Sequence, residues 1–205
     1  YESIPAQLLK QNRRFNYADI KKGLRFAALE NSFLWLYKAG VVLPSFNVTE
    51  PKIALRLNEK SSLVKLYYSD VGLLTCSLGD SVRMGILYDD GLSNLGGIYE
   101  NAVIQELMAH GFNVYYYNSK KMGALDFVIE YNGRVLPIEV KSGKDYYVHS
   151  AVNNVLKTKD FGINEAYVFT AFDVLPKDRI TYFPIYMISF LNNSIHLPTL
   201  EAVTF

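Results

Sequence analysis

The sequence predicts an α/β protein built around a β-hairpin that is flanked by helices. Two alternating apolar runs, 125–131 and 134–140, flank Asn132-Gly133. Asn-Gly between such runs is a strong hairpin signal, because a type I′ turn needs positive φ at both central residues. A helical pattern at 151–160 then precedes an apolar strand at 165–170. A helix between two strands implies a right-handed parallel crossover, so the sheet is expected to be mixed.

Composition places the chain among ordinary globular proteins. Its 205 residues suffice for one large or two small domains. Half of the residues are hydrophobic and a fifth are charged, and the 16 Tyr and 12 Phe favour β-structure and argue against disorder. The formal net charge of +1 supplies no global basic field. Any contact with nucleic acid must therefore depend on a local patch.

Several classes of protein are excluded by what the sequence lacks. The single cysteine, Cys76, allows no internal disulfide and suits a reducing compartment, so we expect a cytoplasmic protein. It lies in an apolar stretch, VGLLTCSL, which predicts a buried and inert thiol. No apolar run approaches the roughly 20 residues that span a bilayer, and no signal peptide is visible. The P-loop pattern G-x-x-x-x-G-K-[ST] is absent, so we expect no nucleotide site in this chain. The chain starts at Tyr1 rather than Met, which indicates a fragment.

Residues 1–80 predict a helical module with a two-stranded wing. Proline within the first turn opens one helix, Asn16 caps a short second one, and Gly40 ends a third. The expected elements are helices at 4–12, 17–22 and 24–39, wing strands at 41–48 and 53–57, a strand at 65–68, and a helix at 71–78 capped by Asp70. Three short helices followed by a wing describe a winged-helix-like module.

Residues 81–205 predict a second domain with the element order αβββαβ. Residues 79–97 are rich in Gly, Ser and Asp and read as a loop, so the domain boundary is placed near residue 80 and treated as soft across that segment. The expected elements are a helix at 98–110, strands at 113–117, 125–131 and 134–140, a helix at 151–160, a strand at 165–170, an edge strand at 180–183 and a helical turn at 186–191.

The hairpin register brings two carboxylates together. With a two-residue loop, the numbers of paired residues sum to 265, which places Asp126 opposite Glu139 at a non-hydrogen-bonded position where Cα atoms approach to about 4.5 Å. The period of two puts Lys141 on the same face. The opposite face reads as core and carries Leu125, Phe127, Ile129, Leu136, Ile138 and Val140.

Like charges directly opposite each other destabilise a sheet, so a cation should offset Asp126 and Glu139. Mg²⁺ takes oxygen ligands and often uses one or two carboxylates. Lys141 beside it could orient a water or stabilise a developing charge. The alternative is a solvated strand edge with one weak salt bridge. His149 and His196 lack metal-ligand spacing and are assigned to surface or packing.

Glu100 is a further candidate, because it shares the apolar stripe of its helix with Val103, Ile104 and Leu107. Burying a carboxylate without a partner is costly, so such a position is informative. Glu100 either joins the site or lies in the first turn and interacts with the helix dipole.

These residues carry a resemblance to a known family. Asp126 followed by Glu139-Val140-Lys141 resembles the (P)D-(D/E)xK motif of the restriction-endonuclease-like superfamily. More specifically, the chain resembles the C-terminal part of prokaryotic AAA-type ATPases whose tail is a domain of unknown function, DUF4143. The matching stretches are SIPAQLLKQN, KLYYSDVGLL, GGIYENAVIQEL, LDFVIEYNG and LPIEVKSGK. Relatives usually carry an acid where this chain has Ala124, which in the predicted register faces Lys141.

The resemblance implies a restriction-endonuclease-like fold and a site made of Glu100, Asp126, Glu139 and Lys141. The three acids are the implied metal ligands, Mg²⁺ is the implied cofactor, and phosphodiester hydrolysis is the implied reaction. It also implies an upstream ATPase domain of the same polypeptide as a partner. Two alternatives stay open: a catalytically inactive nuclease-fold module that recognises nucleic acid or a protein, and a purely structural tail for ATPase assembly.

The winged-helix-like module has two candidate roles. Winged helices often place a recognition helix in the major groove of DNA. The third helix here carries Arg25, Glu30 and Lys38, a mixed face that would release few counterions from DNA. Packing between the implied ATPase domain and the tail is the alternative, and it fits this mixed face better.

Overall fold

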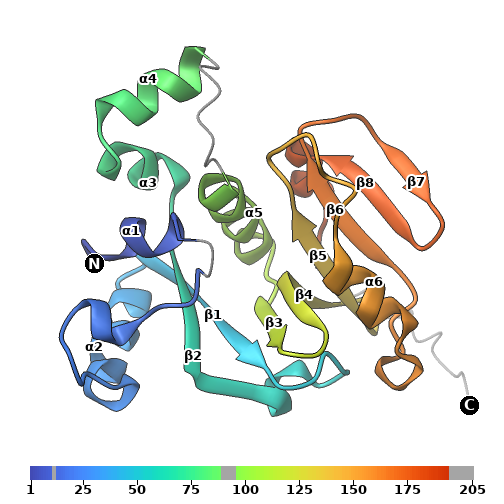
Figure 1. The fold of residues 1–205 in the computed structure, drawn as a ribbon. Coiled ribbons are helices and arrows are strands. Elements are labelled where there is room, and N and C mark those ends of the chain that lie inside the picture. The colour runs from blue at the N-terminus through green and yellow to red at the C-terminus, as the bar shows by residue number, and fades with distance from the viewer. Residues whose placement is uncertain (11–12, 89–95, 194–205) are drawn as a thin grey trace, which may run out of the picture.

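The computed structural model describes residues 1–10, 13–88 and 96–193 (Figure 1). The strands are β1 (Val42–Val48), β2 (Glu59–Tyr68), β3 (Tyr115–Ser119), β4 (Gly123–Tyr131), β5 (Arg134–Val140), β6 (Ala166–Thr170), β7 (Leu175–Lys177) and β8 (Ile180–Pro184). The α-helices are α1 (Ile4–Leu8), α2 (Phe26–Lys38), α3 (Val71–Ser77), α4 (Asp80–Tyr88), α5 (Gly96–Ala109) and α6 (Ser150–Lys157). Short 3-10 helices are η1 (Tyr17–Asp19), η2 (Leu55–Asn58), η3 (Lys159–Phe161) and η4 (Ile185–Phe190).

The described strands form one mixed sheet of eight strands in the order β2-β1-β3-β4-β5-β6-β8-β7. The run α5-β3-β4-β5-α6-β6 has the predicted order, and β6 lies parallel to β5 across the α6 crossover, as expected. The α/β class with a mixed sheet is therefore confirmed. The predicted edge strand, β8, is instead the second strand from the edge, because the short strand β7 pairs with it on the outside.

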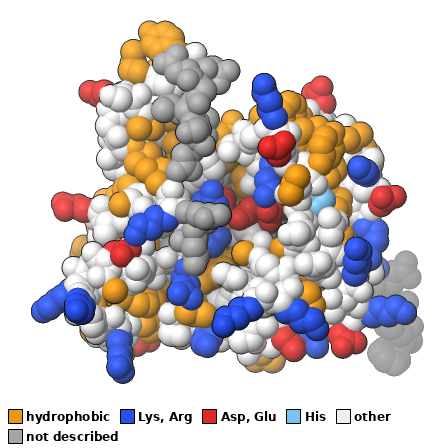
Figure 2. All heavy atoms as spheres, viewed as in Figure 1, with side chains coloured by type: hydrophobic (Ala, Val, Ile, Leu, Met, Phe, Trp, Pro, Cys, Tyr) orange, Lys and Arg blue, Asp and Glu red, His pale blue; other side chains and the backbone are white. Residues whose placement is uncertain are grey.

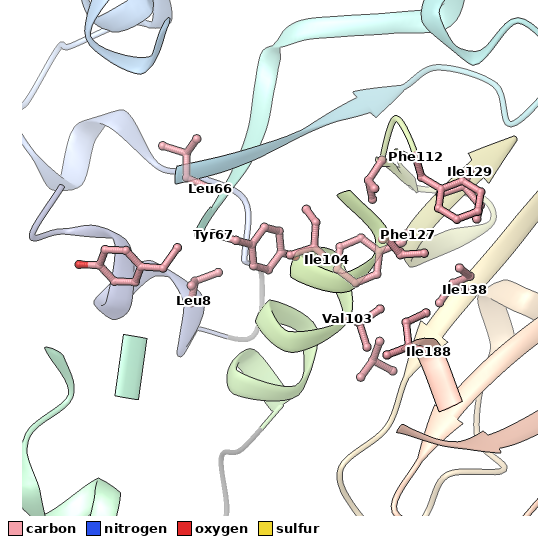
Figure 3. Packing of buried hydrophobic residues seen from close by; sticks show 14 of the residues in the cluster. Leu8, Leu66, Tyr67, Val103, Ile104, Phe112, Phe127, Ile129, Ile138 and Ile188 are labelled. Carbon is pink, nitrogen blue, oxygen red and sulfur yellow. The ribbon is translucent and has the colours of Figure 1, made fainter. Parts of the chain in front are cut away.

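The sheet is covered on both faces. One core cluster joins the sheet to α1, α3, α5 and η4, and Figure 3 shows Val103 and Ile104 of α5 among Tyr67, Phe127 and other buried side chains of the strands. A second cluster joins the sheet to α6. Burial of apolar surface on both faces stabilises the central strands, by about 25 cal/mol for each Å² removed from water.

The predicted hairpin is confirmed. Asn132 and Gly133 have φ of 50° and 71°, as a type I′ turn requires. Tyr131 pairs with Arg134, and the pairs continue in the predicted register as far as Phe127 opposite Ile138. The local sequence therefore sets this part of the sheet.

The predicted faces of β4 are wrong at the far end of the hairpin. Between β3 and β4, Tyr115 pairs with Val128 but Tyr117 pairs with Leu125, so β4 holds one extra residue. This β-bulge breaks the alternation of side chains. As a result, Leu125 packs with Val128 in the second cluster, whereas Phe127 packs in the first.

Three local predictions are also wrong. Residues 53–57 do not form a wing strand: Ala54 has φ of 63°, and η2 follows it, held by a hydrogen bond from the amide of Leu55 to Oε1 of Glu130. Residues 80–88 form helix α4 rather than a loop, after Gly79 (φ 89°) ends α3. Cys76 is exposed rather than buried, because α3 turns mainly Leu74 towards the core.

The N-terminal strands belong to the same sheet as the later ones. β1 pairs antiparallel with β2, which lies beyond the predicted second wing strand at 53–57, and β1 also pairs in parallel with β3 at residues 46–48. Ile4, Leu8 and Phe15 pack in the same cluster as Val103 and Phe127. The first 80 residues thus contribute directly to the core beneath the predicted site.

Candidate functional site

The four predicted site residues come together from three elements. Glu100 lies in α5, Asp126 lies in β4, and Glu139 lies near the end of β5. Lys141 is the first residue after β5. The charges of Asp126 and Glu100 both act on Glu139. Figure 2 shows acidic side chains gathered in a hollow near the middle of one face, with Lys and Arg side chains beside them.

Glu100 is the most deeply buried member, with 1% of its surface exposed. Arg13 donates from Nη1 to Oε1 of Glu100, and the Tyr67 hydroxyl donates to Oε2 at 2.9 Å. Nζ of Lys65 lies 3.7 Å from Oε2. Both carboxylate oxygens of Glu100 therefore have cationic or hydrogen-bonding partners within the chain, so Glu100 is more than a helix-dipole residue.

Asp126 sits where the bulge interrupts the sheet. Its Oδ2 accepts a hydrogen bond from the backbone N–H of Val140 at 2.9 Å. The carboxylate thus bonds an amide that lies beyond the last regular pair of the hairpin, Phe127–Ile138. This hydrogen bond fixes Asp126 to the end of β5. Its Oδ1 lies 4.0 Å from Nη1 of Arg13. Arg13 therefore stands between Glu100 and Asp126.

Glu139 and Lys141 form the other half of the site. Nζ of Lys141 lies 2.8 Å from Oε1 of Glu139. Oε2 of Glu139 is buried and has no hydrogen-bond partner among the described residues. A buried oxygen without a donor is costly and calls for an explanation, such as a bound ion. The acidic partner of Lys141 therefore comes from its own segment rather than from across the hairpin.

The electrostatics of the site raise two acidic pKa values. Burial, followed by the charge of Asp126, raises the pKa of Glu100 to about 7, although Lys65 and Arg13 oppose this. Burial and Asp126 likewise raise the pKa of Glu139 to about 8, against the effect of Lys141. Such shifts mean that the site disfavours the ionised form of each carboxyl group relative to its neutral form. Groups of this kind cluster at functional sites.

Lys141 is held in its charged form. Burial lowers the pKa of Lys141, but the nearby charges of Glu139, Asp126 and Glu100 outweigh burial, and the net effect raises the pKa. The site therefore keeps a full positive charge next to Glu139 across the physiological range of pH.

The donor set is suited to a hard cation, although it is not preassembled. Within residues 1–10, 13–88 and 96–193, no group of three or more His, Cys, Asp or Glu side chains is arranged to hold a metal ion. Oε2 of Glu139 has no hydrogen-bond partner among the described residues, and Oδ1 of Asp126 lies 4.0 Å from Nη1 of Arg13. Both are carboxylate oxygens, which Mg²⁺ prefers.

Sequence reasoning missed the partners of Glu100. Lys65 and Tyr67 alternate on β2, so the period of two could have placed both on one face. Arg13 carries no such signal, because it is 87 residues from Glu100 in sequence. Asn101 was also missed: its buried side chain bonds the backbone N–H and C=O of Tyr68 at 2.8 and 3.0 Å, which ties α5 to β2.

Comparison with known families divides the chain into two parts. A family described as Domain of unknown function (DUF4143) matches residues 95–188. The predicted resemblance to DUF4143 is confirmed for this part of the chain. Residues 1–83 match a second family, described as Domain of unknown function (DUF8612). The N-terminal stretches that suggested DUF4143 therefore fall within the match to this second family.

No curated protein and no solved structure matches the chain. Among the described residues, none of the helices combines the length and apolar character that crossing a bilayer requires. All four predicted site residues lie inside the DUF4143 match, whereas Arg13, Lys65 and Tyr67 come from the DUF8612 match.

Proposed function

We propose that this chain is a nuclease-like module that hydrolyses phosphodiester bonds with the help of a divalent cation. The observation that carries the proposal is the convergence of Glu100, Asp126, Glu139 and Lys141, in which Oε2 of Glu139 is buried without a partner. A phosphodiester is the substrate class because its transition state gains negative charge, which a metal ion and a lysine together can stabilise.

The residues present fit Mg²⁺. Asp126 would hold it through Oδ1 and Glu139 through Oε2, and Glu100 would support the metal or its water. When bound, the ion would supply Lewis acidity and a more acidic water. The raised pKa of Glu139 supports this assignment, because a cation would relieve the same repulsion that raises it.

The chain's own groups would do the remaining work. Lys141, held charged against Oε1 of Glu139, would orient the nucleophile or neutralise charge on the pentavalent phosphorus. Asp126, fixed through Oδ2 by the amide of Val140, would keep Oδ1 in one position. Arg13 would leave or share its contact with Asp126 when another cation arrives.

The finer family assignment belongs to this proposal. The element order α5-β3-β4-β5-α6-β6 supports a restriction-endonuclease-like core, and helices followed by the β1–β2 pair support a winged-helix-like module. A division near residue 80 is supported by the two family matches, which leave residues 84–94 between them. We further propose that an ATPase domain precedes this chain in a cytoplasmic polypeptide.

A second candidate function is recognition without catalysis. Arg13 and Lys65 already neutralise Glu100, and Ala124 stands where the resemblance implies an acid. In this alternative the internal cations substitute permanently for a metal. The fold would then bind nucleic acid or a protein partner under the control of the ATPase domain.

Calorimetric titration with Mg²⁺ or Mn²⁺ distinguishes the two candidates. We expect binding in the wild type and loss of binding in Asp126→Asn and Glu139→Gln, while the control Glu106→Gln, on the same helix as Glu100, binds normally. Cleavage of plasmid and single-stranded DNA is then compared across the same variants. Absence of binding at millimolar metal supports the non-catalytic candidate, and equal cleavage by Asp126→Asn and wild type refutes this site.

A further inference from the structure

The loop after β5 builds a column of aromatic rings beside the carboxylates. Lys141 ends the site, and residues 142–149 lead from it to α6. In this loop the Tyr146 ring stacks on Phe172, with centroids 4.5 Å apart and planes 25° apart, and lies 4.0 Å from the Tyr147 ring. The Tyr182 ring meets Tyr146 and Tyr147 edge-on, at 5.6 and 5.3 Å.

This column faces solvent rather than the core. Tyr147 is 45% exposed and Phe172 is 40% exposed. Figure 2 shows hydrophobic side chains gathered near the loops at the ends of β5 and β6, close to the acidic hollow. Rings that served only to fill the interior would be covered, as Tyr182 is. The exposed column is therefore available for stacking by a flat ligand.

A basic cavity adjoins the column. It has a volume of about 370 Å³ and lies between α6 and the β7–β8 pair, with Tyr147, His149, Lys157 and Lys177 in its wall. The ammonium of Lys177 lies 5.5 Å from the centre of the Tyr147 ring. Asp178 is the one acid among the residues that line the cavity. This volume is in the range of small-ligand sites.

His149 supplies an independent sign of a ligand. It is 7% exposed, its Nε2 meets the Tyr182 hydroxyl at 2.6 Å, and its buried Nδ1 has no partner among the described residues. Arg179, by contrast, is fully engaged with the backbone carbonyls of Leu156, Ile163 and Asn164, so it builds the wall of the cavity.

We propose that the ring column and this cavity form a subsite for single-stranded nucleic acid. Bases stack on the exposed rings of Tyr147 and Phe172, and backbone phosphates meet Lys177 and Lys157. The strand is single because a duplex keeps its base faces stacked on one another, whereas unpaired bases can lie on aromatic side chains. The path of the bound strand rests on the proposed function, since the strand would run from this subsite to Asp126 and Glu139.

The test measures binding without cleavage. A fluorescein-labelled oligo-dT of about 15 nucleotides is titrated with the full chain in EDTA, and fluorescence anisotropy gives Kd. We expect Tyr147→Ala and Phe172→Ala each to raise Kd by about tenfold, and Tyr147→Phe to bind like wild type. Lys177→Ala should raise Kd and lower the slope of log K against log salt by about 0.7.

Matched controls separate the subsite from general surface effects. Tyr186→Ala removes a more exposed ring and Lys38→Ala removes an exposed lysine, both from other elements, and each should stay within about twofold of wild type. Thermal midpoints by circular dichroism confirm that the Tyr147 and Phe172 variants fold. Unchanged affinity in both ring variants, or tighter binding of a duplex of equal length, overturns the proposal. A peptide or protein as the real partner would appear as absence of oligo-dT binding, which overturns it as well.

Failure of this inference is distinguishable from failure of the proposed function. Ring-dependent binding with no cleavage in Mg²⁺ retains the subsite and refutes the nuclease. Cleavage that depends on Asp126 but not on Tyr147 or Phe172 retains the nuclease and refutes the subsite.

Discussion

Replacing Arg13 with methionine tests whether the internal cation holds the acidic site together. The change keeps the length of the side chain and removes the charge that pairs with Oε1 of Glu100 and approaches Asp126. Removing one partner of a buried ion pair costs about 3–5 kcal/mol of the free energy of unfolding. Here Tyr67 and Lys65 still hold Oε2 of Glu100, so we expect about 2–4 kcal/mol at pH 8.

The loss should depend on pH, because the pKa of Glu100 is about 7. Near pH 5 the folded protein carries a protonated Glu100, and Arg13 then interacts with a neutral acid. We expect the cost of Arg13→Met to fall to about 1 kcal/mol there. Urea unfolding followed by circular dichroism measures both values. The lone tryptophan, Trp35, is 68% exposed and would report unfolding poorly.

Arg83→Met is the matched control. Arg83 pairs with Asp80 at 2.9 Å, but both side chains are half-exposed or more, and such pairs contribute at most about 1 kcal/mol. Mg²⁺ should stabilise Arg13→Met more than wild type, because the guanidinium no longer competes for Asp126. If Arg13→Met loses no more stability than Arg83→Met at either pH, the buried pair does not organise the site.

Three further predictions use the same unfolding assay or simple chemistry. The pKa of Glu139 is raised from 4.5 to about 8, so this group contributes its full free energy of unfolding below pH 4.5, and that contribution is lost as pH rises to 8. In EDTA, Glu139→Gln should flatten this decline in stability. An unchanged pH profile would contradict the burial of this charge. Asn101→Ala should cost about 2–4 kcal/mol because it leaves the buried N–H and C=O of Tyr68 without partners, and a loss under about 1 kcal/mol would refute that role. Cys76 should react with a thiol reagent in the native state within minutes, whereas protection until unfolding would show a buried thiol.

Local signals predicted the hairpin and misjudged its far end. Asn132-Gly133 sets both the turn and the register, since positive φ at two adjacent residues leaves few alternatives. The bulge near Asp126 depends on how β4 pairs with β3, which no pattern in β4 alone reveals. The alternation rule therefore placed Leu125 on the wrong face while still bringing Asp126 close to Glu139.

Long-range contacts and one local pair account for the rest of what was missed. The apolar stripe of α5 predicted the burial of Glu100, but its partner Arg13 comes from a distant loop. Helix α4 was misread because Gly and Ser suggested a loop, although neither prevents a helix when Asp80 and Arg83 can pair one turn apart. Exposure of Cys76 follows from the direction in which α3 docks, which hydrophobicity alone does not give.

The parallel pairing of β1 with β3 has a practical consequence for anyone who expresses the C-terminal segment alone. A truncated protein starting near residue 95 would strip β3 of its neighbour at residues 115–117 and leave a bare row of amides and carbonyls, which invites aggregation. It would also deprive Glu100 of every basic group supplied by the first 83 residues. Poor behaviour of such a fragment would reflect the missing strands and cations rather than any defect in the segment itself.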